Sequence, residues 1–364
     1  MHCIQELDTS GARAVESFAH QGERYLVIPQ LAVDIEGQPA QMTLGDSNVD
    51  ALVYRWQDGA FALHQRIPVP GGEDAEFFRI GERAFLATAS LRVGAGPYDL
   101  NAQSTIFELV DGRFTPFQQV PTFAAKQWKH FCIGERHFLA LAQGVTIGAE
   151  TAVHHAKSCI FEWDGTRFGE FQAVRSAWGY NWVFFRAGNE LLLAHADHVE
   201  PSMLLRWTGQ RFEDFQQLDG QSGRAFCFFE AEGEAWLAFA NLHHDSLLYR
   251  WADGRFVIHQ TLSGPGGREF RWIETGTGRR LVQINFLHGT REAPITQLQS
   301  FIHRFEDGRL VIAEEFATSG GTDVTSFEAE GHTHLVVANS LSEAVRFRTP
   351  TQVYRLGERP AAGA

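Results

Sequence analysis

The chain has 364 residues, of which 44% are hydrophobic and 12% aromatic, and it contains 35 glycines. This composition indicates a chain with a large core and many tight turns, and it excludes a wholly disordered protein. The formal charge of −13 argues against nucleic acid or an anionic membrane surface as partner, because both attract a basic footprint.

Cysteine usage and the absence of sorting signals point to a reducing compartment. The four cysteines, Cys3, Cys132, Cys159 and Cys227, have no Cys-x-x-Cys spacing, which favours packed thiols over disulfides or a zinc site. No stretch resembles a signal peptide or a membrane span, and no Asn-x-Ser/Thr acceptor occurs. We therefore expect a cytoplasmic, monomeric protein.

One sequence unit recurs along the chain. An aromatic or aliphatic residue, then Arg or Glu, then another apolar residue precede a Gly turn, and an aromatic with Gln four positions later follows it. Such alternation around a Gly turn predicts a β-hairpin. Six copies begin at Tyr54, Phe107, Phe161, Leu205, Tyr249 and His303, and in the last copy Leu310 and Glu314 replace the aromatic and the Gln.

Between these outer hairpins lies a second, more apolar hairpin. Its strands are nearly continuous in apolar residues, which is typical of strands buried on both faces between neighbouring sheets. Seven such inner hairpins centre on Gly22, Gly81, Gly134, Gly188, Gly233, Gly276 and Gly331.

The seventh outer hairpin is split between the two ends of the chain. It begins at Tyr354, but the chain ends before its second strand, whereas Ile4–Gly11 matches the strand that follows each outer turn. We expect strand 3–9 to pair with strand 351–356, which closes the array and removes its exposed edges. The prediction is an all-β, seven-bladed β-propeller of four-stranded antiparallel blades over residues 1–358, with a tail at 359–364.

The repeat resembles the epitempin (EAR, or EPTP) repeat, through its Arg-Trp, Gly, Phe and Gln positions and the Ala-Asn that ends inner hairpins at Asn241 and Asn339. That repeat builds the seven-bladed propeller of the leucine-rich glioma-inactivated proteins. The resemblance implies a propeller that binds protein partners, and a calcium ion in the central channel. Those proteins are secreted and carry further domains, and a shared fold does not transfer function.

Length variation between the repeats falls on one connection. The turns inside the hairpins stay short, while the connection from inner to outer hairpin varies from residues 242–245 to residues 31–50. In an up-and-down blade this connection shares a face of the disc with the crossover to the next blade. We expect this long-loop face to carry the function, since loops free of packing constraints concentrate binding and catalysis.

Histidines are frequent on the long-loop face. His195 and Asp197 lie two apart on a strand and so point the same way, which suits an acid–base pair or a metal site, with His244 as a third candidate catalytic residue. Solvated loop histidines are the alternative. The candidates for ligand binding on these loops are His154, His155, His198, His243, Asp245 and His288.

Two further sets of residues are candidates for the channel mouth. A polar residue ends the second strand of every inner hairpin, and it either lines the mouth or caps its own backbone. Among the crossover aromatics, Trp178 and Tyr180 form a candidate apolar wall. The polar positions are Gln30, Ser90, Gln143, Asp197, Asn241, Asn285 and Asn339.

Carboxylates near the start of the innermost strands are candidates for a channel cation. Glu16, Asp74, Glu76 and Asp323 offer the hard oxygen ligands that calcium prefers, although they do not recur from blade to blade. Solvated surface carboxylates are the alternative.

The sequence therefore favours a protein that binds a protein, peptide or small molecule, without chemistry of its own. Signatures of hydrolases, zincins, nucleotide-binding proteins and dehydrogenases are absent. The alternative is a small-molecule enzyme, such as a lyase, cyclase or isomerase, that uses the same histidines.

Overall fold

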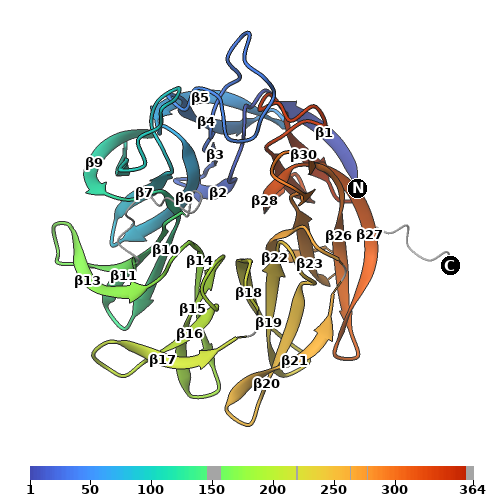
Figure 1. The fold of residues 1–364 in the computed structure, drawn as a ribbon. Coiled ribbons are helices and arrows are strands. Elements are labelled where there is room, and N and C mark those ends of the chain that lie inside the picture. Colours follow the sequence, from blue (N-terminus) through green and yellow to red (C-terminus); the bar gives the residue numbers. More distant parts are fainter. Residues whose placement is uncertain (146–156, 219, 263, 277, 358–364) are drawn as a thin grey trace.

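The computed structural model describes residues 1–145, 157–218, 220–262, 264–276 and 278–357 of the chain. These residues form seven four-stranded antiparallel sheets arranged as blades around one centre (Figure 1). The predicted all-β seven-bladed propeller is confirmed. The described residues contain no helix that is long and apolar enough to cross a membrane.

Each blade runs from an innermost to an outermost strand. Blades 1 to 3 consist of β2 (Glu16–His20), β3 (Glu23–Ile28), β4 (Asp50–Gln57) and β5 (Ala60–Pro68); β6 (Gly72–Ile80), β7 (Arg83–Ser90), β8 (Gln103–Val110) and β9 (Arg113–Pro121); and β10 (Ala125–Ile133), β11 (Arg136–Gln143), β12 (Lys157–Trp163) and β13 (Phe168–Arg175). Blades 4 and 5 consist of β14 (Gly179–Ala187), β15 (Glu190–Asp197), β16 (Met203–Trp207) and β17 (Phe212–Gln217), and of β18 (Gly223–Ala231), β19 (Glu234–Asn241), β20 (Leu247–Ala252) and β21 (Arg255–Thr261).

Blades 6 and 7 depart from this simple order. Blade 6 consists of β22 (Gly267–Thr275), β23 (Gly278–Asn285), β26 (Gln297–Glu306) and β27 (Arg309–Ser319), with the small β24 (His288–Gly289) and β25 (Pro294–Ile295) in its long connection. Blade 7 consists of β28 (Gly321–Ala329), β29 (His332–Asn339), β30 (Thr351–Arg355) and β1 (His2–Leu7).

The core lies between blades rather than inside any one of them. Phe138 and Trp182 are fully buried between blades 3 and 4, in a cluster that draws on both inner hairpins. Phe131 and Phe184 stack across the same boundary with ring centroids 4.5 Å apart. This packing explains why the inner strands are apolar on both faces: each face meets a neighbouring blade.

The repeated glutamine joins a blade to the next at six of the seven boundaries, and Glu314 replaces it in blade 6. Gln216 on β17 donates from Nε2 to the Phe256 carbonyl at 2.7 Å and accepts from the Phe256 amide at 2.9 Å. The outer Gly turn and aromatic of the repeat thus supply the backbone group that the preceding blade's glutamine binds. We call this pair of bonds the glutamine bridge; it also occurs at Gln5–Phe61, Gln65–Phe114, Gln118–Phe168, Gln172–Phe212 and Gln260–Leu310.

The N-terminal strand closes the ring, as predicted. β1 pairs antiparallel with β30, from His2 opposite Arg355 to Leu7 opposite Thr351. Gln5 then makes the glutamine bridge to Phe61 of blade 1, which places β1 as the outermost strand of blade 7.

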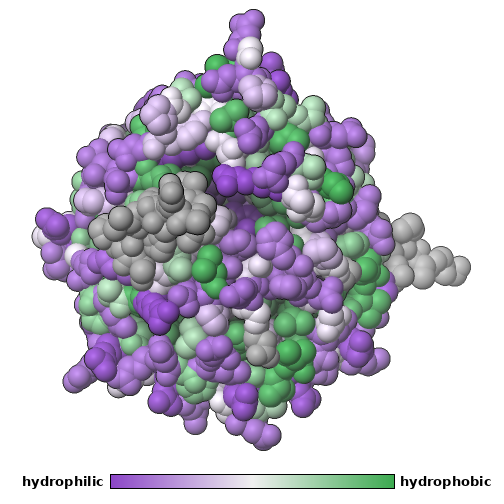
Figure 2. Space-filling view, viewed as in Figure 1, coloured by the Kyte–Doolittle hydropathy of each residue, from purple (hydrophilic) through white to green (hydrophobic). Residues whose placement is uncertain are grey.

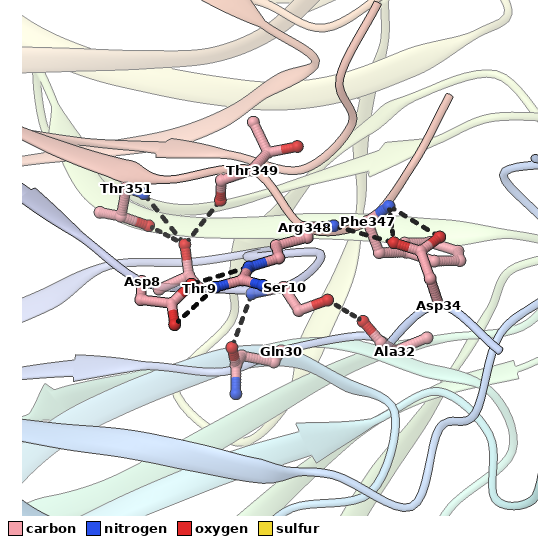
Figure 3. A network of polar contacts seen from close by, with 10 residues as sticks. All are labelled: Asp8, Thr9, Ser10, Gln30, Ala32, Asp34, Phe347, Arg348, Thr349 and Thr351. Carbon is pink, nitrogen blue, oxygen red and sulfur yellow. Dashed lines mark hydrogen bonds and ion pairs between the residues drawn. The ribbon is translucent and has the colours of Figure 1, made fainter. Parts of the chain in front are cut away.

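Polar contacts continue beyond the paired strands at this closure (Figure 3). Thr9 donates from Oγ1 to the Thr349 carbonyl at 2.8 Å, and the Asp34 carboxylate accepts from the Phe347 amide at 3.1 Å. Residues more than 300 positions apart in the sequence are therefore held together by hydrogen bonds beyond the Leu7–Thr351 end of the strand pair.

Candidate functional site at the long-loop mouth of the channel

A β-bulge at the start of the innermost strands creates a ring of side chains. In β6, for example, Gly72 pairs with Ser90 and Asp74 with Ala89, so that Glu73 is the extra residue. The same one-residue shift recurs in β10, β14, β18, β22 and β28. Bulges re-aim side chains. We call the bulged residues, with Arg13 at the matching position of blade 1, the channel ring; they are Arg13, Glu73, Lys126, Tyr180, Arg224, Arg268 and Thr322, and all line the central cavity.

The channel ring lies at the long-loop end of the channel, because every innermost strand starts there after the crossover from the preceding blade. The cavity that it lines has a volume of about 200 Å³. Hydrophilic residues gather around the centre of the disc in the space-filling view (Figure 2).

Three of the four cations of the ring share one carboxylate. The Glu73 carboxylate lies 3.5 Å from Arg13 Nε, 3.5 Å from Lys126 Nζ and 3.9 Å from Arg268. Arg224 instead lies over the Tyr180 ring, with its guanidinium carbon 3.9 Å from the ring centroid. The mouth thus holds four positive side chains and a single carboxylate, all in a largely buried setting.

The pKa shifts of Tyr180 and Glu73 indicate a positive electrostatic potential at the channel ring. Burial works to raise the pKa of Tyr180, but Arg224, Lys126 and Arg268 outweigh it, and the net shift is downward. Burial likewise works to raise the pKa of Glu73, and Lys126, Arg13 and Arg268 again lower it overall. Both acidic groups are therefore held toward their charged forms, which is the effect expected next to uncompensated cations.

Aromatic and histidine side chains adjoin the channel ring on the side of blade 4. The rings of Trp178 and His198 meet edge-on with centroids 4.7 Å apart, Trp178 stacks on Tyr180 at 5.9 Å, and His243 lies 5.6 Å from His198. The structure thus brings together four of the predicted ligand-binding residues from blades 4 and 5. We call Trp178, Tyr180, His198 and His243 the aromatic cluster.

Two polar atoms at this mouth are buried without a hydrogen-bond partner among the described residues: Trp178 Nε1 and His198 Nδ1. Burial lowers the pKa of His198 to about 3, with Arg224 and His243 acting in the same direction. His198 is therefore neutral at physiological pH. Unpaired buried polar groups carry a free-energy cost, which a ligand that pairs them would remove.

A carboxyl layer lies below the channel ring. The four carboxylates predicted to hold a cation, Glu16, Asp74, Glu76 and Asp323, all line the central cavity together with Glu269. Burial raises the pKa of Glu269 to about 8 and that of Glu16 to about 7. Burial also raises the pKa of Asp74 well above its usual range. The raised pKa values favour the neutral forms of Glu16, Asp74 and Glu269, whereas Glu76 is paired with Lys129, whose Nζ lies 2.9 Å from the Glu76 carboxylate.

The geometry of this layer does not fit one calcium ion. Asp74 accepts from the Trp128 amide of the next blade and Asp323 from the Val15 amide, each at 2.8 Å, so these carboxyl groups join neighbouring blades. Across the described residues, no three acidic residues of the channel bring one carboxylate oxygen each to within 4.8 Å of one another. A calcium ion holds six to eight oxygens at 2.3–2.6 Å, which demands closer convergence.

The predicted catalytic pair is buried within blade 4. His195 stacks on Trp182 with ring centroids 3.8 Å apart, and its Nε2 lies 3.1 Å from Ser176 Oγ. Ser176 Oγ in turn donates to Asp197 Oδ2 at 2.8 Å. His195 is 2% exposed and Asp197 1% exposed, whereas His244 is exposed on the loop and lies outside this group.

Three of the polar residues that end the second strands bond to backbone groups of nearby segments. Asn241 Oδ1 accepts from the amides of His243 and His244 at 3.1 and 3.0 Å. Asn285 donates to the Gln299 carbonyl at 2.7 Å, and Asn339 accepts from the Ser319 amide at 2.9 Å. Their side chains order the long-loop connections, in line with the capping alternative, and their role in ligand binding stays a prediction.

The remaining loop candidates are spread over the face. Asp245 is exposed beside His244 in blade 5, and His288 is half-exposed on β24 in blade 6. His154 and His155 lie outside the described residues.

Comparisons with known proteins agree with the repeat and the fold. A model of the EPTP domain matches residues 60–109, 113–164 and 211–252. The thrombospondin-type laminin G domain and EAR repeat-containing proteins of Homo sapiens and Mus musculus are 30% and 31% identical over 143 residues, which is 38% of this chain. The alignment spans 20% of the length of these relatives.

Over these three stretches the chain matches the EPTP repeat.

Solved structures show the same fold at low sequence identity. A β-propeller domain from Myceliophteria thermophila aligns with a TM-score of 0.59 and 10% identity, covering 97% of this chain and 99% of that one. A putative 6-phosphogluconolactonase from Bacteroides uniformis aligns with a TM-score of 0.61 and 13% identity, covering 93% of each chain. At such identities the likeness concerns the fold alone.

Each EPTP match straddles two blades. The match at 60–109 runs from β5 of blade 1 to β8 of blade 2, and the matches at 113–164 and 211–252 have the same offset. The glutamine bridge therefore joins one EPTP unit to the next, and the offset leaves β1 to complete blade 7.

Sequence reasoning missed the channel ring. The EPTP pattern does not include it, because the bulged position holds Arg, Glu, Lys, Tyr or Thr in different blades. One signal was present: the position directly follows a Gly or Ala, which starts the innermost strand in blades 2 to 7 and is Ala12, ahead of β2, in blade 1. Comparison of this one position across the seven blades shows four basic residues and one acidic residue.

Proposed function

We propose that this EPTP propeller is a binding protein that holds an anionic group of its ligand at the long-loop mouth of the channel. A β-propeller of EPTP repeats is a general scaffold for protein interaction. The observation that carries the finer proposal is that the channel ring holds four cations and one carboxylate: Arg13, Lys126 and Arg268 lie within 4 Å of Glu73, and Arg224 lies over Tyr180.

Electrostatics favours an anion at this point. Charges act more strongly in a buried setting than in water, and cations without a matching anion repel one another there. A carboxylate or phosphate would relieve that repulsion and accept hydrogen bonds from the guanidinium groups, which suit planar oxyanions.

The size of the cavity suggests how a ligand is held. A space of about 200 Å³ is smaller than the roughly 300–1,000 Å³ of pockets that bury a whole drug-sized molecule. It suits one anionic group, such as an acidic side chain or a small carboxylate. The rest of a protein or peptide ligand would then lie over the long-loop face, against the aromatic cluster.

Equilibrium binding tests this function. Isothermal titration with citrate, inorganic phosphate and a glutamate-rich peptide should detect binding that weakens as salt rises. Lys126→Gln and Arg268→Gln should each weaken it roughly tenfold or more, the cost of losing a charged hydrogen bond. Arg186→Gln is the matched control, because Arg186 is exposed near the opposite end of β14.

Two results would contradict the proposal. One is a folded wild-type protein that binds none of these anions, and the other is binding that the two ring substitutions leave unchanged. The enzyme alternative gains no support from His195 and Asp197, since both are buried and bonded within blade 4. A cytoplasmic, monomeric setting remains our prediction.

A further inference from the structure

A second cluster of ligand-type side chains lies on the inner hairpin of blade 3, away from the long-loop face. His130 and Cys132 lie two residues apart on β10, and His137 on β11 is the cross-strand partner of Cys132. All three side chains therefore project from one face of the hairpin. The site is next to the turn at Gly134, whereas the crossovers and long connections lie at the other end of the strands.

The three potential ligand atoms converge on one point. His130 Nε2 lies 3.1 Å from His137 Nδ1, and Cys132 Sγ lies 3.2 Å from His137 Nδ1 and 3.9 Å from His130 Nε2. Within the described ranges this is the only group of three or more such residues whose ligand atoms all lie within 4.8 Å of one another.

These separations match a tetrahedral metal site. Zinc binds imidazole nitrogen at about 2.0–2.1 Å and thiolate sulfur at about 2.3 Å, so tetrahedral angles place two nitrogens about 3.3 Å apart and nitrogen and sulfur about 3.6 Å apart. The observed distances differ from these by only a few tenths of an ångström. Small rotations of the Cys132 and His137 side chains would complete the geometry.

The surroundings hold one ligand in place and leave the site accessible. The His130 ring stacks on Phe78 of blade 2, with centroids 4.5 Å apart, and the His130 amide donates to Glu76 at 3.0 Å. Cys132 is exposed. A metal ion could therefore enter from solvent without disturbing the core.

We propose that His130, Cys132 and His137 bind one divalent transition-metal ion of borderline softness, with zinc as the best match. Two imidazoles and one thiolate suit zinc in preference to calcium or magnesium, which take oxygen ligands. Three protein ligands leave one tetrahedral position for water or an exogenous group.

Cobalt is the probe that tests the site, because its spectrum reports both the ligand set and the geometry. Titration of the full chain with Co²⁺ should saturate at one ion per chain, with a thiolate charge-transfer band and the intense visible bands of four-coordinate cobalt. Zinc should then displace the cobalt and remove both sets of bands. Cys132→Ser should abolish the charge-transfer band, and His137→Ala should weaken cobalt binding at least tenfold.

Cys3→Ser and His259→Asn are the controls, since each removes a residue of the same type outside the cluster, and both should bind cobalt as the wild type does. Far-ultraviolet circular dichroism establishes that each variant is folded. The proposal is overturned if folded wild-type protein binds no cobalt or zinc. It is equally overturned if Cys132→Ser keeps the charge-transfer band, or if Cys3→Ser loses it.

Discussion

At the residue scale, the glutamine of the repeat has a structural role, because its side chain links one blade to the next. Its amide satisfies both backbone groups of a residue about 40 to 56 positions away. The sequence analysis found this glutamine as a marker of the outer hairpin. Its partner could not be predicted, because the pattern of one hairpin contains no information on which backbone group in the next blade it faces.

Replacement of Gln216 by Leu should destabilise the protein by roughly 1–3 kcal/mol, because the amide and carbonyl of Phe256 lose their partner at the edge of a packed blade. Chemical denaturation with urea measures the difference. The neighbouring Gln217 is exposed, so Gln217→Leu should change the free energy of unfolding by less than about 0.5 kcal/mol. Equal effects of the two substitutions would argue against the bridge.

The carboxyl layer predicts how stability changes with pH. Burial, aided by Asp323, raises the pKa of Glu269 from 4.5 to about 8 in the folded protein. The folded state thus binds the extra proton between these values, and the free energy of unfolding falls as pH rises through that window. One such group contributes a slope of up to about 1.4 kcal/mol per pH unit.

Glu269→Gln should flatten this dependence and make the variant more stable than the wild type at pH 8. Urea denaturation at a series of pH values from 4.5 to 8 measures both curves, with exposed Glu82→Gln as control. Parallel curves for wild type and Glu269→Gln would show that the carboxyl group is charged in the folded protein across the whole range.

At the element scale, the bulge that starts the innermost strands determines where the candidate site lies. It turns one residue of each strand into the channel, and it requires a small residue directly before it. The hairpins themselves follow from the repeat and its Gly turns, and they were predicted. The bulge was not predicted. A strand that is buried on both faces is apolar throughout, so a one-residue shift in register does not change its hydrophobic pattern.

Gly179 shows the constraint on the residue before the bulge. A Cβ atom there would lie 2.6 Å from His195 Cε1 and 2.7 Å from Ser158 Oγ. Gly179→Ala should therefore lower the free energy of unfolding by about 1–3 kcal/mol through overpacking. Gly169→Ala is the matched change on β13, where a Cβ meets no atom within 4 Å, and it should have little effect in the same thermal or urea unfolding experiment. A Gly179→Ala variant as stable as Gly169→Ala would contradict this packing.

At the scale of the whole molecule, closure of the ring joins seven sheets into one domain, because the core lies between the sheets and no sheet has a core of its own. The split of the last outer hairpin between the two chain ends predicted this closure, and the pairing of β1 with β30 agrees with it. Because the blades form a closed ring and successive strands are antiparallel, the long connections all lie on one face of the disc. Which side chains meet at the channel mouth depends on packing across blades, and the repeat alone does not determine it.

Deletion of residues 1–7 should remove a whole outermost strand, expose the edge of β30 and cause loss of cooperative unfolding or aggregation. Light scattering and thermal denaturation measure both effects. By contrast, Asp8→Asn breaks only the exposed ion pair with Arg348, and it should cost less than about 1 kcal/mol. A truncated chain with the stability of the intact protein would exclude β1 as a closing strand.

The most direct test of an anion at the channel mouth locates the anion itself. Crystals of the wild-type protein soaked in selenate, and diffracted at the selenium absorption edge, should show an anomalous peak between Arg13, Arg224 and Arg268, and this peak should be absent in a Lys126→Gln/Arg268→Gln variant. Selenate found only on the outer surface of the disc, with no peak inside the channel ring, would contradict the proposed site.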